Sequence, residues 1–132
     1  MGIKLAKEKL FHSIDANNHA DVRIVLNKFP NLINEYFDSE KSSLPIVRAV
    51  WLGRKEMVEL LLEFGADPTI SVKNGFNSLF IAARKGHTDI LELLIQKGCP
   101  FDVADNMGFT PLDIAIINGY YNASLLLVKF VR

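Results

Sequence analysis

The chain has 132 residues, of which 49% are hydrophobic and 23% are charged, and its 15 Lys and Arg side chains balance 15 Asp and Glu side chains. This composition is typical of one folded domain with an apolar core and excludes a disordered, low-complexity segment. The zero net charge argues against nucleic acid as a partner, because a duplex-binding surface carries a basic surplus.

The cysteine content and the hydropathy pattern limit the compartment. The chain has one cysteine, Cys99, so it can form no internal disulfide and no zinc ribbon. A reducing compartment, the cytoplasm or the nucleus, is therefore expected. No apolar run reaches the length that a membrane span needs, and no membrane contact is predicted.

A 33-residue period organises most of the chain. Gly53, Gly86 and Gly119 are 33 residues apart, and an alanine precedes each of them by four residues. A looser copy of the pattern, "LFHSIDANNHADVRIVLNKFP", precedes them. Such a period indicates repeated supersecondary units. We expect one domain, residues 1–132, whose four units have the approximate bounds 1–37 (a degenerate N-terminal cap), 38–70, 71–103 and 104–132.

Each unit is predicted to contain two short helices. In chain order, the helices of the last three units are expected at residues 45–52 and 55–64, 78–85 and 88–97, and 111–118 and 121–130. Thr110 before Pro111 is a favourable helix start, and Asp113 three residues later can complete a capping box. The periodic glycines then end each first helix. Helices of this length are marginal alone, so each unit must pack on its neighbours.

The units resemble the ankyrin repeat. The segments that carry the resemblance are "LPIVRAVWLGRKEMVELLLEFGAD", "GFNSLFIAARKGHTDILELLIQKG" and "GFTPLDIAIINGYYNASLLL". It implies an all-α repeat solenoid of stacked antiparallel helix pairs joined by β-hairpin-like loops. Three features depart from the family pattern: Val47, Phe80 and Asp113 replace its histidine, Leu44 replaces the capping Thr, and Arg48 must reach solvent or find an acid.

Nothing in the sequence indicates catalysis. The three histidines, His12, His19 and His87, have no Cys or carboxylate at ligand spacing, so a structural role is favoured over metal binding. Cys99 has no partner base nearby in the sequence, and we interpret it as a small packed side chain. We expect no enzyme activity, no cofactor and no metal. The acids of the second helices are interpreted as a solvated outer face: Glu56, Glu59, Glu63, Asp89 and Glu92.

The resemblance implies protein binding by the concave face of first helices and loop tips. The residues that it places there are unusually apolar and aromatic, which is typical of interfaces. They are Trp51, Leu52, Phe76, Arg84, Lys85, Met107, Phe109, Ile117 and Asn118. The alternative is that the aromatic residues pack on their neighbours, and in particular that Phe76 and Phe109 stack on each other.

Charge suggests the chemistry of the partner. Lys41, Lys73, Arg84 and Lys85, with Arg54 and Lys55 nearby, are expected on the loop side, which favours an acidic segment with apolar anchors. Ordinary solubilising charge is the alternative.

The last helix has an apolar outer face. Leu125 stands where the earlier units have Glu59 and Glu92, and Val128 and Val131 follow it. Further repeats, a second copy of the chain or a partner could cover these side chains.

These patterns together predict a non-catalytic protein–protein interaction module. An inhibitory or targeting subunit that docks on an enzyme, and an architectural fragment of a larger ankyrin-repeat protein, are the alternatives.

Overall fold

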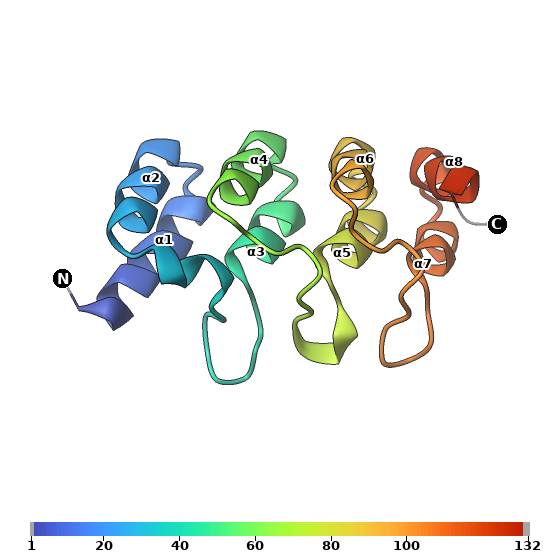
Figure 1. Ribbon diagram of the computed structural model, residues 1–132. Helices are drawn as coiled ribbons and strands as arrows, with labels where there is room; N and C mark the ends of the chain where they lie inside the picture. The colour runs from blue at the N-terminus through green and yellow to red at the C-terminus, as the bar shows by residue number, and fades with distance from the viewer. Residues whose placement is uncertain (1, 131–132) are drawn as a thin grey trace. The chain divides into compact units, whose positions relative to one another are not determined.

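The computed structural model describes residues 2–130, and these residues form α-helices and short 3-10 turns without a strand (Figure 1). The chain divides into two compact units, residues 1–67 (the N-unit) and residues 68–132 (the C-unit). Each unit contains two helix pairs, as the all-α repeat class requires. The helices are α1 (Ile3–Asp15), α2 (His19–Lys28), α3 (Pro45–Trp51), α4 (Lys55–Glu63), α5 (Ser78–Lys85), α6 (Thr88–Gln96), α7 (Pro111–Ile117) and α8 (Tyr121–Phe130), with 3-10 turns η1 (Pro30–Asn34) and η2 (Lys73–Gly75).

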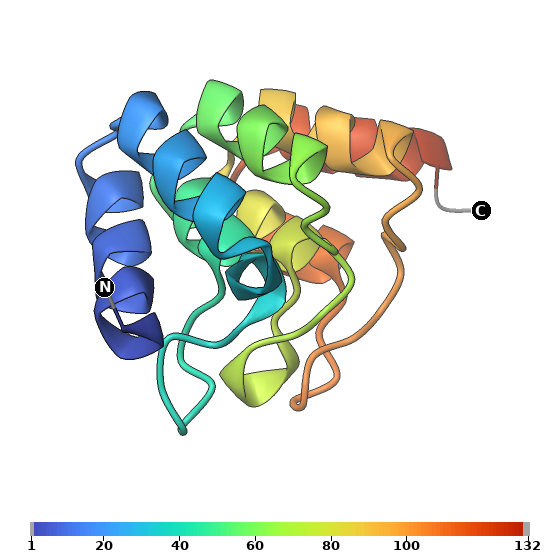
Figure 2. The same cartoon turned by 60° about the vertical axis from the view of Figure 1, so that its left-hand side comes forward.

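The N-unit is held together by α1, which packs against both α2 and α3, while α3 packs against α4 (Figure 2). The fully buried side chains at the centre of this unit include Leu10, Ile14, Leu26, Ile46 and Leu61. All five come from helices, so the core forms where the apolar stripes of the helices face one another.

The C-unit repeats this arrangement. Helix α5 packs against α6 and α7, and α8 packs against both α6 and α7. Its core contains Leu79, Phe80 and Ile90 from the first pair and Ala115 and Leu127 from the second. The small Ala115 lets α7 lie close to its neighbours, because it leaves no bulk between the helix backbones.

The predicted helix bounds agree with the structure to within a residue for α3 to α8. Helix α1 extends further toward the N-terminus than the repeat pattern indicated, since it begins at Ile3. Ala6, Leu10 and Ile14 recur at helical spacing and are fully buried, which explains the extra turns. The approximate bounds of the four repeats are not tested by this division and stay a prediction.

Local signals start the helices of the C-unit. The Thr110 hydroxyl accepts from the Asp113 N–H at 3.2 Å, and the Asp113 carboxylate accepts from the Thr110 N–H at 2.9 Å, which confirms the predicted capping box. The Asn77 side chain caps α5 in the same way, accepting from the Phe80 N–H at 2.8 Å. Leu44 provides no side-chain cap for α3, as its apolar side chain requires.

Gly86 ends α5 and also allows a close tertiary contact. Its φ of 71° lies in the left-handed region that a Cβ disfavours. A Cβ built on Gly86 would meet the Tyr120 ring at 2.6–2.8 Å. The Tyr120 ring, between α7 and α8, therefore packs directly against the backbone of Gly86 at the end of α5.

The loops before the first helices close like hairpins. The Phe37 N–H donates to the Ser43 carbonyl at 2.9 Å, the Val72 N–H to the Phe76 carbonyl at 2.8 Å, and the Asp105 N–H to the Phe109 carbonyl at 2.9 Å. In the C-unit, the Asn106 N–H also donates to the Asn74 carbonyl at 3.0 Å, so its two loops lie side by side. No helix within residues 2–130 is both long and apolar enough to cross a membrane.

Candidate binding surfaces

The end of α5 presents a stacked group of two aromatic rings and a cation. The Phe76 ring lies on the buried Phe80 ring, with centroids 4.9 Å apart and planes 10° from parallel. The Arg84 guanidinium lies over the Phe76 ring, 5.2 Å from its centroid. Phe80 is only 2% exposed, so the stack extends from the core to the surface. A cation above an aromatic face is attracted by the ring quadrupole, which holds Arg84 in place.

The neighbouring loop and α7 present an apolar surface. Met107 at the loop tip is 81% exposed, and Ile116 and Ile117 at the end of α7 are each 59% exposed. These side chains, with Gly108, Phe109 and Asp113, line a shallow depression. Its walls are apolar except at Asp113, whose carboxylate caps α7.

A side-chain hydrogen bond joins these two areas of the C-unit. Asn118, directly after α7, donates from its Nδ2 to the Arg84 carbonyl at 3.2 Å. Because α5 also packs directly against α7, the Arg84–Phe76 stack and the Ile117 side of the depression belong to neighbouring helix ends. The two areas together are termed the C-unit face. It consists of Phe76, Arg84, Lys85, Met107, Phe109, Ile116, Ile117 and Asn118.

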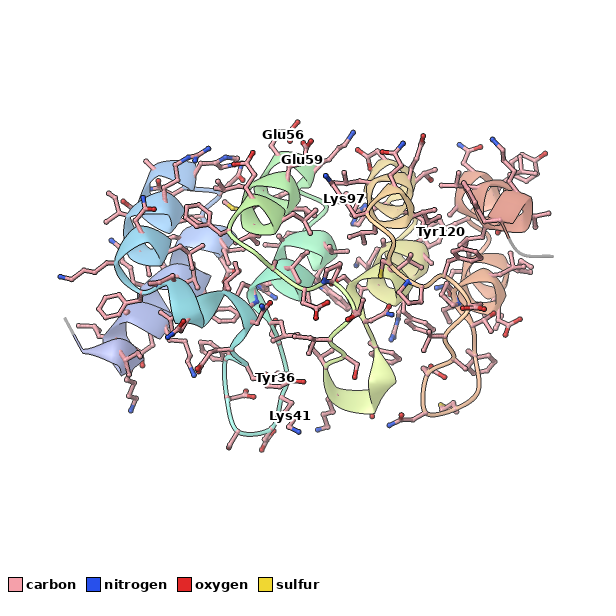
Figure 3. All side chains as sticks on the ribbon, in the orientation of Figure 1. Tyr36, Lys41, Glu56, Glu59, Lys97 and Tyr120 are labelled. Carbon is pink, nitrogen blue, oxygen red and sulfur yellow. The ribbon has the colours of Figure 1, made fainter. Side chains whose placement is uncertain are left out.

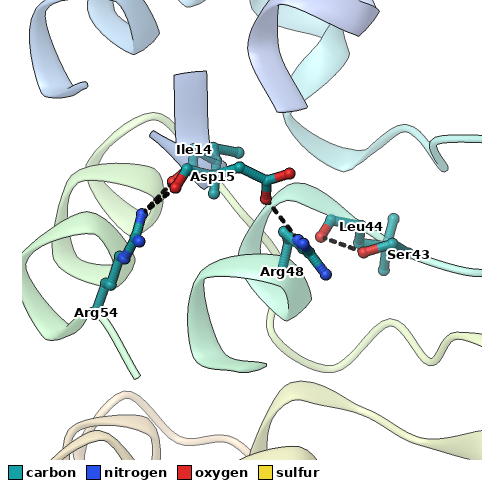
Figure 4. Close-up of polar contacts among 6 residues, drawn as sticks. All are labelled: Ile14, Asp15, Ser43, Leu44, Arg48 and Arg54. Carbon is teal, nitrogen blue, oxygen red and sulfur yellow. Dashed lines mark hydrogen bonds and ion pairs between the residues drawn. The ribbon is translucent and has the colours of Figure 1, made fainter. Parts of the chain in front are cut away.

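The N-unit holds the other two predicted residues, Trp51 and Leu52. Trp51 is the last residue of α3 and is 40% exposed, while Leu52, which follows it, is half-buried. Arg48 on the same helix forms an ion pair with Asp15, since its Nε donates to the Asp15 carboxylate at 2.6 Å (Figure 4).

A second arginine of the N-unit has a structural task. The Arg54 Nη1 donates to the carbonyls of Ile14 and Asp15, at 2.8 and 2.6 Å, at the end of α1 (Figure 4). A cation at a helix C-terminus donates to carbonyls that lack a partner within the helix and interacts favourably with the negative end of the helix dipole. Arg54 therefore joins the two helix pairs of the N-unit, a role that the sequence pattern did not reveal.

The comparisons with known proteins agree with this architecture. The family model for ankyrin repeats, in three copies, matches residues 46–131, well over half of the chain. The chain belongs to the ankyrin-repeat family. It is also similar to the human 2-5A-dependent ribonuclease, with 35% identity over 86 residues, which make up 64% of this chain and 12% of that protein. The chain thus covers only a small part of the length of that relative.

Sequence reasoning did not assign Ile116 to the C-unit face, and it did not identify Phe80 and Asp113 as residues that adjoin this face. Ile116 occupies the place of the buried Ala83 one period earlier, and a large apolar side chain at a small-residue position was the signal that could have identified it. Phe80 supports Phe76 from below, and Asp113 lies at the depression. No sequence signal pointed to the position of Phe80 or Asp113 at this surface, although their partners, Phe76 and Thr110, lie only four and three residues earlier in the chain.

The N-unit carries acids on its outer helix and also in its loop, where exposed Asp38 and Glu40 lie close to Lys41 in the sequence. Glu56 and Glu59 on α4 are exposed, and they lie on the side opposite the loop that carries Lys41 (Figure 3). The Lys41 ammonium lies 5.6 Å from the centroid of the Tyr36 ring, within the same loop. Glu63, Asp89 and Glu92 are exposed as well.

Other candidate groups have structural surroundings. Cys99 is 2% exposed, and its thiol lies 3.7 Å from the Pro68 carbonyl oxygen. No group of three or more His, Cys, Asp or Glu side chains that could hold a metal ion occurs within residues 2–130. On α8, Leu125 is 48% exposed and Val128 is 54% exposed, while Val131 lies outside the described residues.

Proposed function

We propose that this ankyrin-repeat chain is a non-catalytic module that binds a partner protein, and that the C-unit face is a principal contact surface. Ankyrin repeats generally mediate protein–protein interaction, and the repeat is a non-catalytic fold. The ribonuclease in the name of the human relative is a property of a protein of which this chain matches 12%, so nuclease activity is no part of this proposal.

The observation that carries the proposal is the exposure of large apolar side chains beside a positioned arginine. Met107, Ile116 and Ile117 are each more than half exposed around one depression. Arg84, on the neighbouring helix α5, lies over the Phe76 ring. Exposed apolar clusters with a charged rim mark interaction sites, and Arg and aromatic residues dominate interface energies. Trp51 offers a second anchor of this kind on the N-unit.

The test compares binding by matched surface variants of the full chain. Ile117→Ser and Ile24→Ser remove the same side chain from positions that are 59% and 65% exposed, on α7 and α2 respectively. Both should leave thermal unfolding almost unchanged, because exposed positions contribute little to stability. Quantitative affinity capture should lose the same proteins with Ile117→Ser that it retains with Ile24→Ser. Equal capture by both variants would remove the C-unit face from the proposal.

A further inference from the structure

We infer that the C-unit face, in its proposed role as a protein-binding surface, recognises an extended partner segment by one carboxylate and one large apolar side chain. The carboxylate pairs with Arg84, and the apolar side chain enters the depression beside Ile117. This inference rests on the proposed function and adds the chemistry and spacing of the segment.

Arg84 is suited to bind a carboxylate. Its guanidinium is held over Phe76, which is in turn held by the buried Phe80, so little side-chain entropy remains to be lost on binding. A guanidinium that lies over an aromatic ring can still donate its N–H groups to a carboxylate, so the two contacts are compatible. None of the ion pairs among residues 2–130 involves Arg84.

The surrounding charges favour an acid over a base. Lys85 follows Arg84 directly, and exposed Lys73 lies in the loop that also carries Phe76. The two acids of this region have local partners: Asp105 accepts from the N–H groups of Met107 and Phe109, both at 2.9 Å, and Asp113 caps α7. These two carboxylates are held at their own loop and helix end by backbone N–H donors, and the three cations Lys73, Arg84 and Lys85 outnumber them.

The depression is suited to one apolar side chain. Met107, Ile116 and Ile117 border it, and more than half of the surface of each is exposed to solvent. Covering these side chains removes apolar area from water, which is favourable in proportion to that area. The unbranched Met107 can adjust to the shape of the incoming group.

The packing of the two helices sets the spacing between the two recognition points. Arg84 and Ile117 occupy equivalent positions, 33 residues apart, on helices that are in direct contact. Packed helix axes lie about 8–10 Å apart. An extended segment in the polyproline II conformation advances about 3.1 Å per residue and has about three residues per turn, so an acidic and an apolar residue on the same face of the ligand should be separated by about three positions.

A selection from a random peptide library displayed on phage tests the inference. The baits are the full chain, its Arg84→Glu variant and a Lys97→Glu control. Lys97 is the capping residue after α6, is exposed, and lies on the helix side of the C-unit, away from the loops (Figure 3). The two substitutions change the net charge equally. The full chain and Lys97→Glu should both enrich an acidic residue about three positions from a large apolar residue, whereas Arg84→Glu should enrich Lys or Arg in place of the acid.

The possible outcomes separate this inference from the function on which it rests. Identical enriched sequences on all three baits would overturn the role of Arg84, although binding of peptides as such would stand. Enrichment of acidic residues without an apolar residue at the stated spacing would overturn the role of the depression. The absence of enrichment on every bait would count against both the inference and the proposed function.

A synthetic peptide from the selection provides a second, quantitative measurement. Replacing its acidic residue by the matching amide should weaken binding to the full chain about tenfold or more, because hydrogen bonds to charged groups contribute about 1.5–3 kcal/mol. The same replacement should change binding to Arg84→Glu far less. An equal loss on both proteins would overturn the pairing between the carboxylate and Arg84.

Discussion

Replacing Gly86 and Gly119 by alanine separates backbone strain from a tertiary clash. The two glycines are 33 residues apart and have nearly the same conformation, with φ of 71° and 75°. They differ in their surroundings: a Cβ on Gly86 would lie 2.6 Å from the Tyr120 ring, whereas a Cβ on Gly119 would meet nothing within 4 Å. Gly119→Ala therefore reports strain alone, and Gly86→Ala reports strain plus the clash.

The expected magnitudes follow from these two terms. The left-handed conformation costs a residue with a Cβ about 1–2 kcal/mol, and the smaller entropy of the unfolded chain returns about 0.4–1 kcal/mol. Gly119→Ala should thus lower the free energy of unfolding by about 1 kcal/mol. Forcing extra volume against a packed neighbour adds about 1–3 kcal/mol, so Gly86→Ala should cost about 2–4 kcal/mol. The clash includes Cγ of Tyr120, close to its backbone, and small side-chain adjustments cannot relieve it.

Urea unfolding followed by circular dichroism measures both losses. With slopes of about 1–3 kcal/mol/M for small proteins, the midpoints of the two variants should differ by about 1 M. The double variant Gly86→Ala/Tyr120→Ala should recover most of the clash term, because it removes the ring that the new Cβ would meet. Equal midpoints for Gly86→Ala and Gly119→Ala would refute the reasoning, since Tyr120 would then impose no constraint on Gly86.

Three further measurements test other parts of the structure. Thr110→Ala should cost about 1 kcal/mol of stability in thermal unfolding and Thr110→Ser much less, because only the alanine loses the helix cap; equal losses would contradict a capping role. Arg54→Ala should lower the free energy of unfolding by about 1.5–3 kcal/mol, since the carbonyls at the end of α1 lose a charged donor. Arg48→Ala should lower it by less than about 1 kcal/mol, because the ion pair between Arg48 and Asp15 is partly exposed. Cys99, which is 2% exposed, should react with a thiol reagent only as fast as the chain opens, and a rate equal to that in urea would contradict its burial.

Local rules made the helices predictable. The bounds of α5 agree residue by residue with the prediction, because Asn77 caps the start of the helix and Gly86 ends it. The capping box of Thr110 and Asp113 involves residues three apart, so its geometry follows from the helix itself. The exposure of the acids on α4 and α6 is also a local property, since it depends on which face of each helix is apolar.

Contacts between distant residues were predictable only in part. The sequence required that Arg48 reach solvent or an acid, and the structure provides Asp15, which lies 33 residues earlier. The period suggested that Phe76 could stack on Phe109, but the structure places its ring on Phe80. Both rings were plausible partners, because a repeat period gives equivalent positions without giving the direction in which a side chain turns.

The amino-acid sequence by itself determined the repeat, the helix pairs and the family, because the helix signals lie within one unit and the same residues recur 33 positions apart. Only the tertiary structure decided which groups lie beside one another at the helix ends and loops, among them Arg84 on the Phe76 ring and the Tyr120 ring on Gly86. The physical reason is that helix formation depends on residues three to four positions apart, whereas a binding surface depends on rotamers and close approaches across packed helices.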